Sequence, residues 1–253
     1  MTIFTHPTRS MILNPFIVVS EAGLGYFIIH RHNRWQKIVL MEIRKMQDIS
    51  EVDLREYYKA PHEGKTCRIV RIGKAYQMDI NKIWEAITQE NHIPNWFLPI
   101  SGDLTEGGNY DLVGNASGKI LVCKAPHEFK ITWEFMGDVS WVAVSLEEEN
   151  NSTNLILSHI MNYGEGDPFW AKYGPGATGV GWGLCFLGLT NYLATGTSVV
   201  EEGKIWVGTD EGRVYLKNEA ESWADVHIAT GEDPETAQNM AEETYKFYAG
   251  LAG

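Results

Sequence analysis

The feature that most constrains the fold is a series of five strand-like segments at short spacing in the middle of the chain. They cover residues 109–114, 118–125, 128–135, 139–148 and 153–161, and apolar and polar side chains alternate in them. The sequences between them, GNASG, PHE, MGD and EENNS, are typical of turns. Loops this short join only neighbouring antiparallel strands. The sequence therefore predicts an antiparallel meander and excludes a doubly wound nucleotide-binding fold.

Helical patterns flank the meander on both sides. Before it, Asp79 or Asn81 caps a helix that buries Ile83 and Trp84. After it, the spacing predicts a long helix over residues 177–194 that ends at Gly196. Glycines inside a helix cost stability, so we expect those of the long helix to allow close packing against the sheet.

The ends of the chain add further elements. Residues 48–60 have the spacing of a short amphipathic helix, and residues 66–78 alternate like a strand. The tail predicts two more helices, one over residues 218–230 and one that begins with Asp233 as its cap and runs to Tyr248.

The first 45 residues do not fit this pattern. Their apolar stretch, residues 11–29, is interrupted by Pro15 and Glu21, so we expect neither a membrane span nor a signal peptide there. Regular amphipathic sequence begins only later, which makes Met41 and Met46 plausible alternative starts. We therefore treat residues 1–45 as an extension separate from the folded part.

Charge and cysteine content narrow the class of partners and the compartment. The formal net charge is -12, and residues 197–253 alone hold four basic and twelve acidic residues, a net -8. This surface would repel a polyanion, which excludes nucleic acid as a partner. The three cysteines, Cys67, Cys123 and Cys185, are odd in number and far apart, which indicates neither disulfides nor a metal site. A cytoplasmic location fits these thiols best.

Motifs for catalysis or for a cofactor are not evident. In the glycine-rich stretch over residues 96–120, the segment GDLTEGGN lacks the lysine of a phosphate-binding loop, and the stretch fits better as turns that start the meander. Gly174 to Gly179 match GxGxxG, but no βαβ unit surrounds them. The chain has no GxSxG and no HExxH sequence. We expect no cofactor, no metal and no catalytic set.

A sheet with one long helix across it encloses a space that aromatic rings can line. We expect the ligand-binding residues to be Trp96, Phe97, Tyr110, Trp133, Trp141, His159, Trp182 and Phe186. His159 is in register with Leu155 and Leu157 and should face the same side as they do. There it would bind a ligand or carry a proton, or it would be a satisfied histidine at the end of a strand.

Several segments together resemble a known family. They are residues 79–120, ITWEF, VSWVAVSL, NLILSH and YGPGATGVGW. These look like the SRPBCC (START-like) superfamily, and within it the bacterial branch homologous to the activator of the heat-shock protein 90 ATPase. The resemblance covers about Cys67 to Gly196, and the tail is similar to that of the bacterial subgroup.

The resemblance implies a helix-grip fold, in which a curved antiparallel sheet wraps around a long C-terminal helix with a hydrophobic cavity between them. We therefore expect an α+β protein with an extension over residues 1–45, a helix-grip domain over 46–196 and an acidic helical extension over 197–253. Members of the superfamily include lipid and hormone carriers, polyketide cyclases and co-chaperones, so the fold alone does not decide the function.

Three functions remain open at this point. The first is binding of a small apolar, aromatic or lipid-like ligand, with no reaction. The second is a cyclase or hydrolase acting on a polyketide-like substrate, with His159 as the acid or base; it is disfavoured because no second catalytic group has suitable spacing. The third is a chaperone-regulating protein of the stress response that works through its surface. A homodimer is compatible with all three.

Overall fold

The computed structural model describes residues 52–162, 164 and 166–251, and these residues form an α+β fold around one eight-stranded sheet. The strands are β1 (Leu54–His62), β2 (Lys65–Tyr76), β3 (Ile100–Gly102), β4 (Asn109–Leu112), β5 (Ser117–Lys124), β6 (Glu128–Phe135), β7 (Asp138–Glu149) and β8 (Ser152–Asn162). Their order is β1-β2-β8-β7-β6-β5-β4-β3, and all neighbours are antiparallel. The five strands expected between residues 109 and 161 are thus confirmed as β4 to β8.

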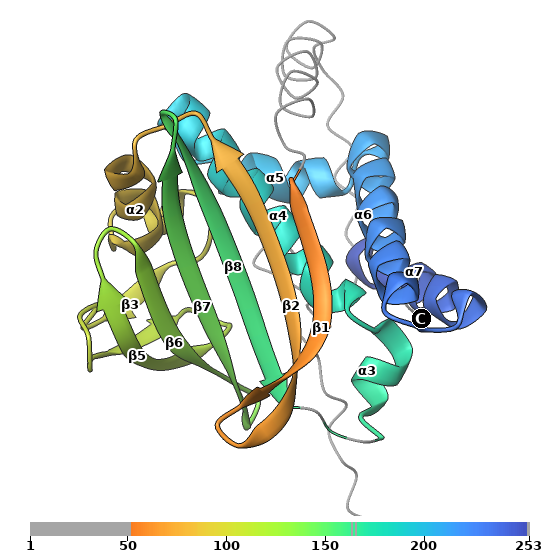
Figure 1. Cartoon of the computed structure of the whole chain (residues 1–253). Helices are drawn as coiled ribbons and strands as arrows, with labels where there is room; N and C mark the ends of the chain where they lie inside the picture. Colours follow the sequence, from red (N-terminus) through yellow and green to blue (C-terminus); the bar gives the residue numbers. More distant parts are fainter. Residues whose placement is uncertain (1–51, 163, 165, 252–253) are drawn as a thin grey trace, which may run out of the picture.

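Helices cover one face of the sheet and extend past its edge strand β1 (Figure 1). They are α2 (Ile80–Thr88), the 3-10 turn η1 (Ile93–Asn95), α3 (Pro168–Tyr173), α4 (Gly176–Thr195), α5 (Val200–Val207), α6 (Asp210–Ala229) and α7 (Pro234–Tyr248). The long helix α4 crosses one face of the sheet, while α6 and α7 lie on the other side of α4. This arrangement confirms the expected helix-grip fold.

Several helix ends follow the local chemistry of the sequence. Asp79 caps α2 by accepting a hydrogen bond from the backbone N–H of Asn81, 2.9 Å away. Asp233 caps α7 in the same way, with Pro234 at the first helical position. Gly196 ends α4 in the left-handed conformation, with φ of 69°, which a residue without a Cβ adopts at little cost.

The helix expected over residues 48–60 is wrong for the part that the structure describes, because Leu54–His62 form strand β1. A two-residue turn, Glu63 and Gly64, has φ of 49° and 77° and joins β1 to β2 as a hairpin. Pairing with β2 along the full length of β1 outweighs the weak helical pattern of this segment. Pro61, which has no N–H to donate, is tolerated because β1 is at the edge of the sheet.

The expectation that the glycines of α4 allow close packing against the sheet is also wrong. Several of them pack against the tail helices rather than against the sheet: a Cβ on Gly179 would lie 2.0 Å from Trp223 of α6, and one on Gly176 would lie 2.9 Å from Thr244 of α7. Glycine does allow a close approach in α4, but the sequence does not show which element approaches.

The tail belongs to the same hydrophobic core as the sheet. Trp206, Leu216, Trp223 and Tyr248 are buried in one continuous cluster with side chains of the strands and of α4. None of the described helices is long and apolar enough to cross a membrane. The expected extension over residues 1–45 lies outside the described residues.

Candidate ligand-binding cavity

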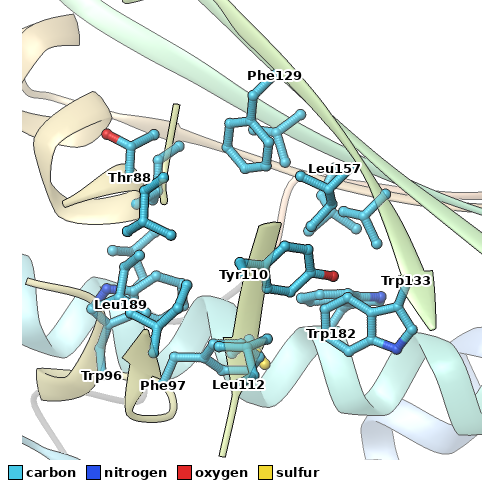
Figure 2. Close-up of a pocket in the computed structure, with 18 of the residues that line it drawn as sticks. Thr88, Trp96, Phe97, Tyr110, Leu112, Phe129, Trp133, Leu157, Trp182 and Leu189 are labelled. Carbon is cyan, nitrogen blue, oxygen red and sulfur yellow. The ribbon is translucent and has the colours of Figure 1, made fainter. Parts of the chain in front are cut away.

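A partly enclosed cavity of about 140 Å³ lies between the sheet and α4. On the same scale one water needs only about 10–15 Å³, so the space is large enough for a small organic molecule. Figure 2 shows the side chains converging on it, with Phe129 and Leu157 on the sheet side and Trp182 and Leu189 on the helix side. The cavity therefore lies where a helix-grip fold leaves room between its two layers.

Almost all of the lining is apolar. Its residues are Ile87, Thr88, Ile93, Trp96, Phe97, Ile100, Leu104, Tyr110, Leu112, Ile120, Cys123, Phe129, Ile131, Trp133, Val142, Val144, Leu155, Leu157, Trp182, Cys185, Phe186 and Leu189. No aspartate, glutamate, lysine, arginine or histidine is among these described residues. Such a surface binds through apolar contact area and rings rather than through charge.

The few polar groups of the lining are mostly engaged within the protein. The hydroxyl of Tyr110 donates to the carbonyl oxygen of Thr132 over 2.7 Å, and that of Thr88 donates to the carbonyl of Trp84 over 2.6 Å. The indole N–H of Trp96 donates to the carbonyl of Ala86 over 2.9 Å. Because these donors are satisfied, the lining offers few hydrogen bonds that a ligand must match.

The turn before β3 holds two of the rings in place. Trp96 and Phe97 follow η1 and stack on each other with ring centroids 5.5 Å apart. The turn is tied to α4 because Nδ1 of His92 lies 2.7 Å from the hydroxyl of Tyr192. The position of this ring pair is therefore coupled to the helix that forms the opposite wall.

Three rings from three different segments of the chain form one end of the cavity. Trp182 of α4 stacks on Phe97, with centroids 6.2 Å apart and planes at 27°. Trp133 of β6 meets Trp182 edge to face at 5.4 Å and 67°. Both geometries are favourable for aromatic pairs.

His159 lies behind this end, with both ring nitrogens engaged. Nδ1 accepts a hydrogen bond from the indole N–H of Trp182 over 3.1 Å, and an indole nitrogen can only donate. The proton of the neutral ring is therefore on Nε2, which lies 2.9 Å from Oγ of Ser140, and Ser140 in turn donates to the carbonyl of Trp133. Desolvation by burial lowers the pKa of His159 to about 4.

The comparisons with known proteins agree with the fold. The model of a family described as "Activator of Hsp90 ATPase homolog 1-like protein" matches residues 77–194. The crystal structure of CalU16 from Micromonospora echinospora is 32% identical over 60% of this chain and 92% of its own, with a TM-score of 0.47. The solution structure of CalU16 is 26% identical over 80% of this chain and 95% of its own, with a TM-score of 0.52.

The chain belongs to the family of Activator of Hsp90 ATPase homolog 1-like proteins. Another solved structure that matches is the Aha1 dimer from Colwellia psychrerythraea, with 19% identity over 51% of this chain and 97% of its own and a TM-score of 0.42. No curated protein matches the chain.

Six of the eight expected ligand-binding residues line the cavity: Trp96, Phe97, Tyr110, Trp133, Trp182 and Phe186. His159 is not in the lining, although it does face the same side as Leu155 and Leu157. It lines a smaller chamber next to the cavity, with Trp133 and Trp182 between the two.

Trp141 does not line either space. It lies on the other face of the sheet, where it packs against His62 with ring centroids 4.6 Å apart and joins a small cluster with Cys67, Ile69 and Ile160. Side chains alternate along a strand, so Val142 and Val144, which do line the cavity, require that Trp141 point away.

The aliphatic residues of the lining were not among the residues predicted from the sequence. Leu189 of α4 follows Trp182 and Phe186 at helical spacing, so the periodicity that predicted those two residues also indicated Leu189. Leu104 and Ile100 come from the loop and the short strand before β4, where no periodicity exists to place them.

The chemistry available in the cavity of this family member is limited. Burial raises the pKa of both lining thiols, Cys123 and Cys185, so neither is activated as a thiolate. Among the described residues, no three histidine, cysteine, aspartate or glutamate side chains come together as a metal site would require. The arrangement is suited to holding an apolar molecule.

Proposed function

We propose that this protein binds a small apolar, ring-bearing or lipid-like ligand in the cavity between the sheet and α4, without transforming it. The observation that supports this most strongly is a space of about 140 Å³ surrounded by apolar side chains. A void of this size in a core forfeits stability on the order of a few kcal/mol. A ligand that fills it would recover the lost contacts and the buried apolar area.

A reaction in the cavity is less well supported. The hypothesis of a cyclase or hydrolase relied on His159 as acid or base, but both of its nitrogens are engaged in hydrogen bonds. It lies outside the main lining, and its lowered pKa of about 4 makes it a poor proton carrier near neutral pH.

The remaining expectations stay proposals. We propose a cytoplasmic location, in keeping with three cysteines that are all free. We also propose the domain limits 46–196 and 197–253, although the helices of the tail share the core of the sheet. A homodimer and a chaperone partner stay predictions that oligomer measurements and pull-down experiments can test.

The test of ligand binding uses the fluorescent, uncharged probe N-phenyl-1-naphthylamine. We expect saturable binding with enhanced probe emission and quenching of the tryptophans in the cavity wall. Leu104 is half-buried in a loop and lines the cavity, so Leu104→Trp fills the space with little strain on the fold. This variant should weaken binding at least tenfold.

The matched control is Val214→Trp, because Val214 is exposed on α6 and does not line the cavity. It should bind the probe like the natural protein. Native mass spectrometry of the freshly purified protein should reveal an apolar molecule that is lost on denaturation. Absence of saturable binding, or equal binding by Leu104→Trp and the natural protein, would overturn the proposed function.

A further inference from the structure

A second, smaller chamber lies next to the main cavity. Its volume is about 30 Å³, and Phe97, Trp133, Trp182 and Cys185 line both spaces. The remaining lining of the small chamber is Asn115, His159, Ala177, Thr178 and Gly181. The two spaces are therefore separated only by these four shared residues.

The two chambers differ in polarity. The small chamber adds two half-buried residues with polar side chains, Asn115 and Thr178. The Thr178 hydroxyl donates only to the sulfur of Met161 at 3.5 Å, a weak interaction, and the side-chain amide of Asn115 has no hydrogen bond to another described residue. Both groups can thus bind a hydroxyl or carbonyl of a ligand.

Neither chamber contains a cation. No lysine or arginine is among the described residues that line them, and His159 is held neutral because its Nδ1 accepts the N–H of Trp182. Burying a carboxylate or phosphate without a partner charge costs far more than burying a hydroxyl. The site should therefore reject anionic amphiphiles such as ionised fatty acids.

The shared wall can open at a small cost. Phe97 has no polar side-chain atom, and the thiol of Cys185 makes no hydrogen bond to another described residue. Rotation of Phe97 would break ring contacts with Trp96 and Trp182 but no hydrogen bond. A bound ring can replace these ring contacts.

We propose that the two chambers together hold one neutral amphiphilic ligand, with its apolar ring system in the main cavity and a single hydroxyl or carbonyl end at Asn115 and Thr178. This inference rests on the proposed function and specifies its ligand class. It predicts selection by charge and by the presence of one polar end.

The test compares naphthalene, 2-naphthol and 2-naphthoate at pH 7.5, which share one ring system. One net hydrogen bond should make 2-naphthol bind roughly 3- to 10-fold more tightly than naphthalene. The ionised 2-naphthoate should bind at least tenfold more weakly than 2-naphthol. Thr178→Val removes the hydroxyl and keeps the shape, so it should reduce the preference for 2-naphthol over naphthalene.

Introducing a positive charge at the small chamber gives the more discriminating test. Thr178→Lys places a cation at the small chamber and should raise the affinity for 2-naphthoate at least tenfold while leaving that for naphthalene nearly unchanged. Asn115→Lys is the second variant if the first does not fold, because Asn115 lies in a turn between β4 and β5. Val214→Lys, on the exposed face of α6, is the control and should not change the selectivity.

The outcomes separate the two proposals. If none of the three compounds binds, the proposed function is wrong. If all three bind the natural protein equally well, or if neither lysine variant improves binding of 2-naphthoate, the cavity binds ligands but the assignment of a neutral ligand with its polar end in the small chamber is wrong.

Discussion

Two faces of the same helix, α4, are packed in contrasting ways. One face carries Gly176, Gly179 and Gly183, and the tail helices approach it so closely that a Cβ on Gly179 would overlap the ring of Trp223. The other face carries Trp182, Cys185, Phe186 and Leu189, and in front of it lies the cavity of about 140 Å³. We call the first the clamp face and the second the cavity face.

The difference shows how the protein keeps a space open without losing a defined structure. Core side chains normally collapse toward a void, and the extent of collapse sets the cost of the void. Here the clamp face fixes α4 from the side away from the sheet. The hydroxyl of Tyr248 adds to this by donating to the carbonyl of Ala177 in the first turn of α4, over 2.5 Å. The tail thus stabilises the geometry of the cavity from a distance.

The largest expected effect comes from adding one methyl group to the clamp face. Gly179→Ala places a Cβ 2.0 Å from Trp223, which is fully buried and cannot move aside. Overpacking of this kind should lower the free energy of unfolding by about 3 kcal/mol. Urea denaturation followed by circular dichroism measures it.

The matched control is Gly208→Ala, after α5. Gly208 has ordinary helical φ and ψ of -81° and -9°, and a Cβ there would come no closer than 3.5 Å to any other residue. This variant should be neutral or slightly stabilising. Equal stability of the two variants would show that the clamp face is not as tightly packed as the structure indicates.

The next largest effect is the pH dependence of stability that buried His159 should cause. The pKa of His159 is about 4 in the folded protein and ordinary, about 6.5, in the unfolded chain, so the unfolded chain binds the extra proton first as pH falls. The free energy of unfolding should therefore decline below pH 6.5, and protonation of His159 should cause no further decline below pH 4. Between pH 8 and pH 5 the loss from this residue should be about 2 kcal/mol.

His159→Asn tests this because its side-chain oxygen can still accept the N–H of Trp182 but does not titrate. The free energy of unfolding of this variant should change with pH by about 2 kcal/mol less than that of the natural protein over the same range. The exposed His127, changed to Asn, serves as the control. A profile of His159→Asn that parallels the natural one would rule out burial of a neutral His159.

A smaller effect is expected for the hydrogen bond of the clamp. Tyr248→Phe removes only the hydroxyl that donates to Ala177, and both groups are buried, so the cost should be about 1 kcal/mol or slightly more. Tyr245→Phe is the comparison, because the hydroxyl of half-buried Tyr245 bonds to no described residue. If the two variants lose the same stability, the bond to α4 adds nothing to the clamp.

The sequence predicted the cavity face better than the clamp face, for a physical reason. Strand alternation and helical spacing are local, and they placed Trp133, Trp182 and Phe186 on the correct side. They also fixed that Trp141 and Val142 face opposite ways, but not which of the two faces the helix. That choice depends on the position of α4, and alternation within a strand gives no information about that position.

The clamp depends on contacts between residues far apart in the chain. Gly179 and Trp223 are separated by more than forty positions, and nothing local marks them as partners. The same limit applies to β1, whose residues have a weak helical pattern and become a strand only by pairing with β2. In this segment the Glu63-Gly64 turn was the one local signal for a hairpin.

The smallest expected effect comes from adding one methylene group to the cavity face. Val144 lines the cavity from β7 and is buried, so Val144→Ile extends into empty space rather than into a neighbour. Filling part of a void should raise the free energy of unfolding by roughly 0.5–1 kcal/mol. The same change should weaken binding of N-phenyl-1-naphthylamine, because the ligand and the added group compete for one space.

The control for this last change is Val70→Ile. Val70 is fully buried in β2 but lines neither chamber, so the same added group has no void to enter and should lower stability by about 1 kcal/mol or more. Opposite signs for the two variants in urea denaturation, with binding affected only by Val144→Ile, would establish that the space in front of α4 exists in solution. Two changes of the same sign would mean that the cavity closes in the free protein.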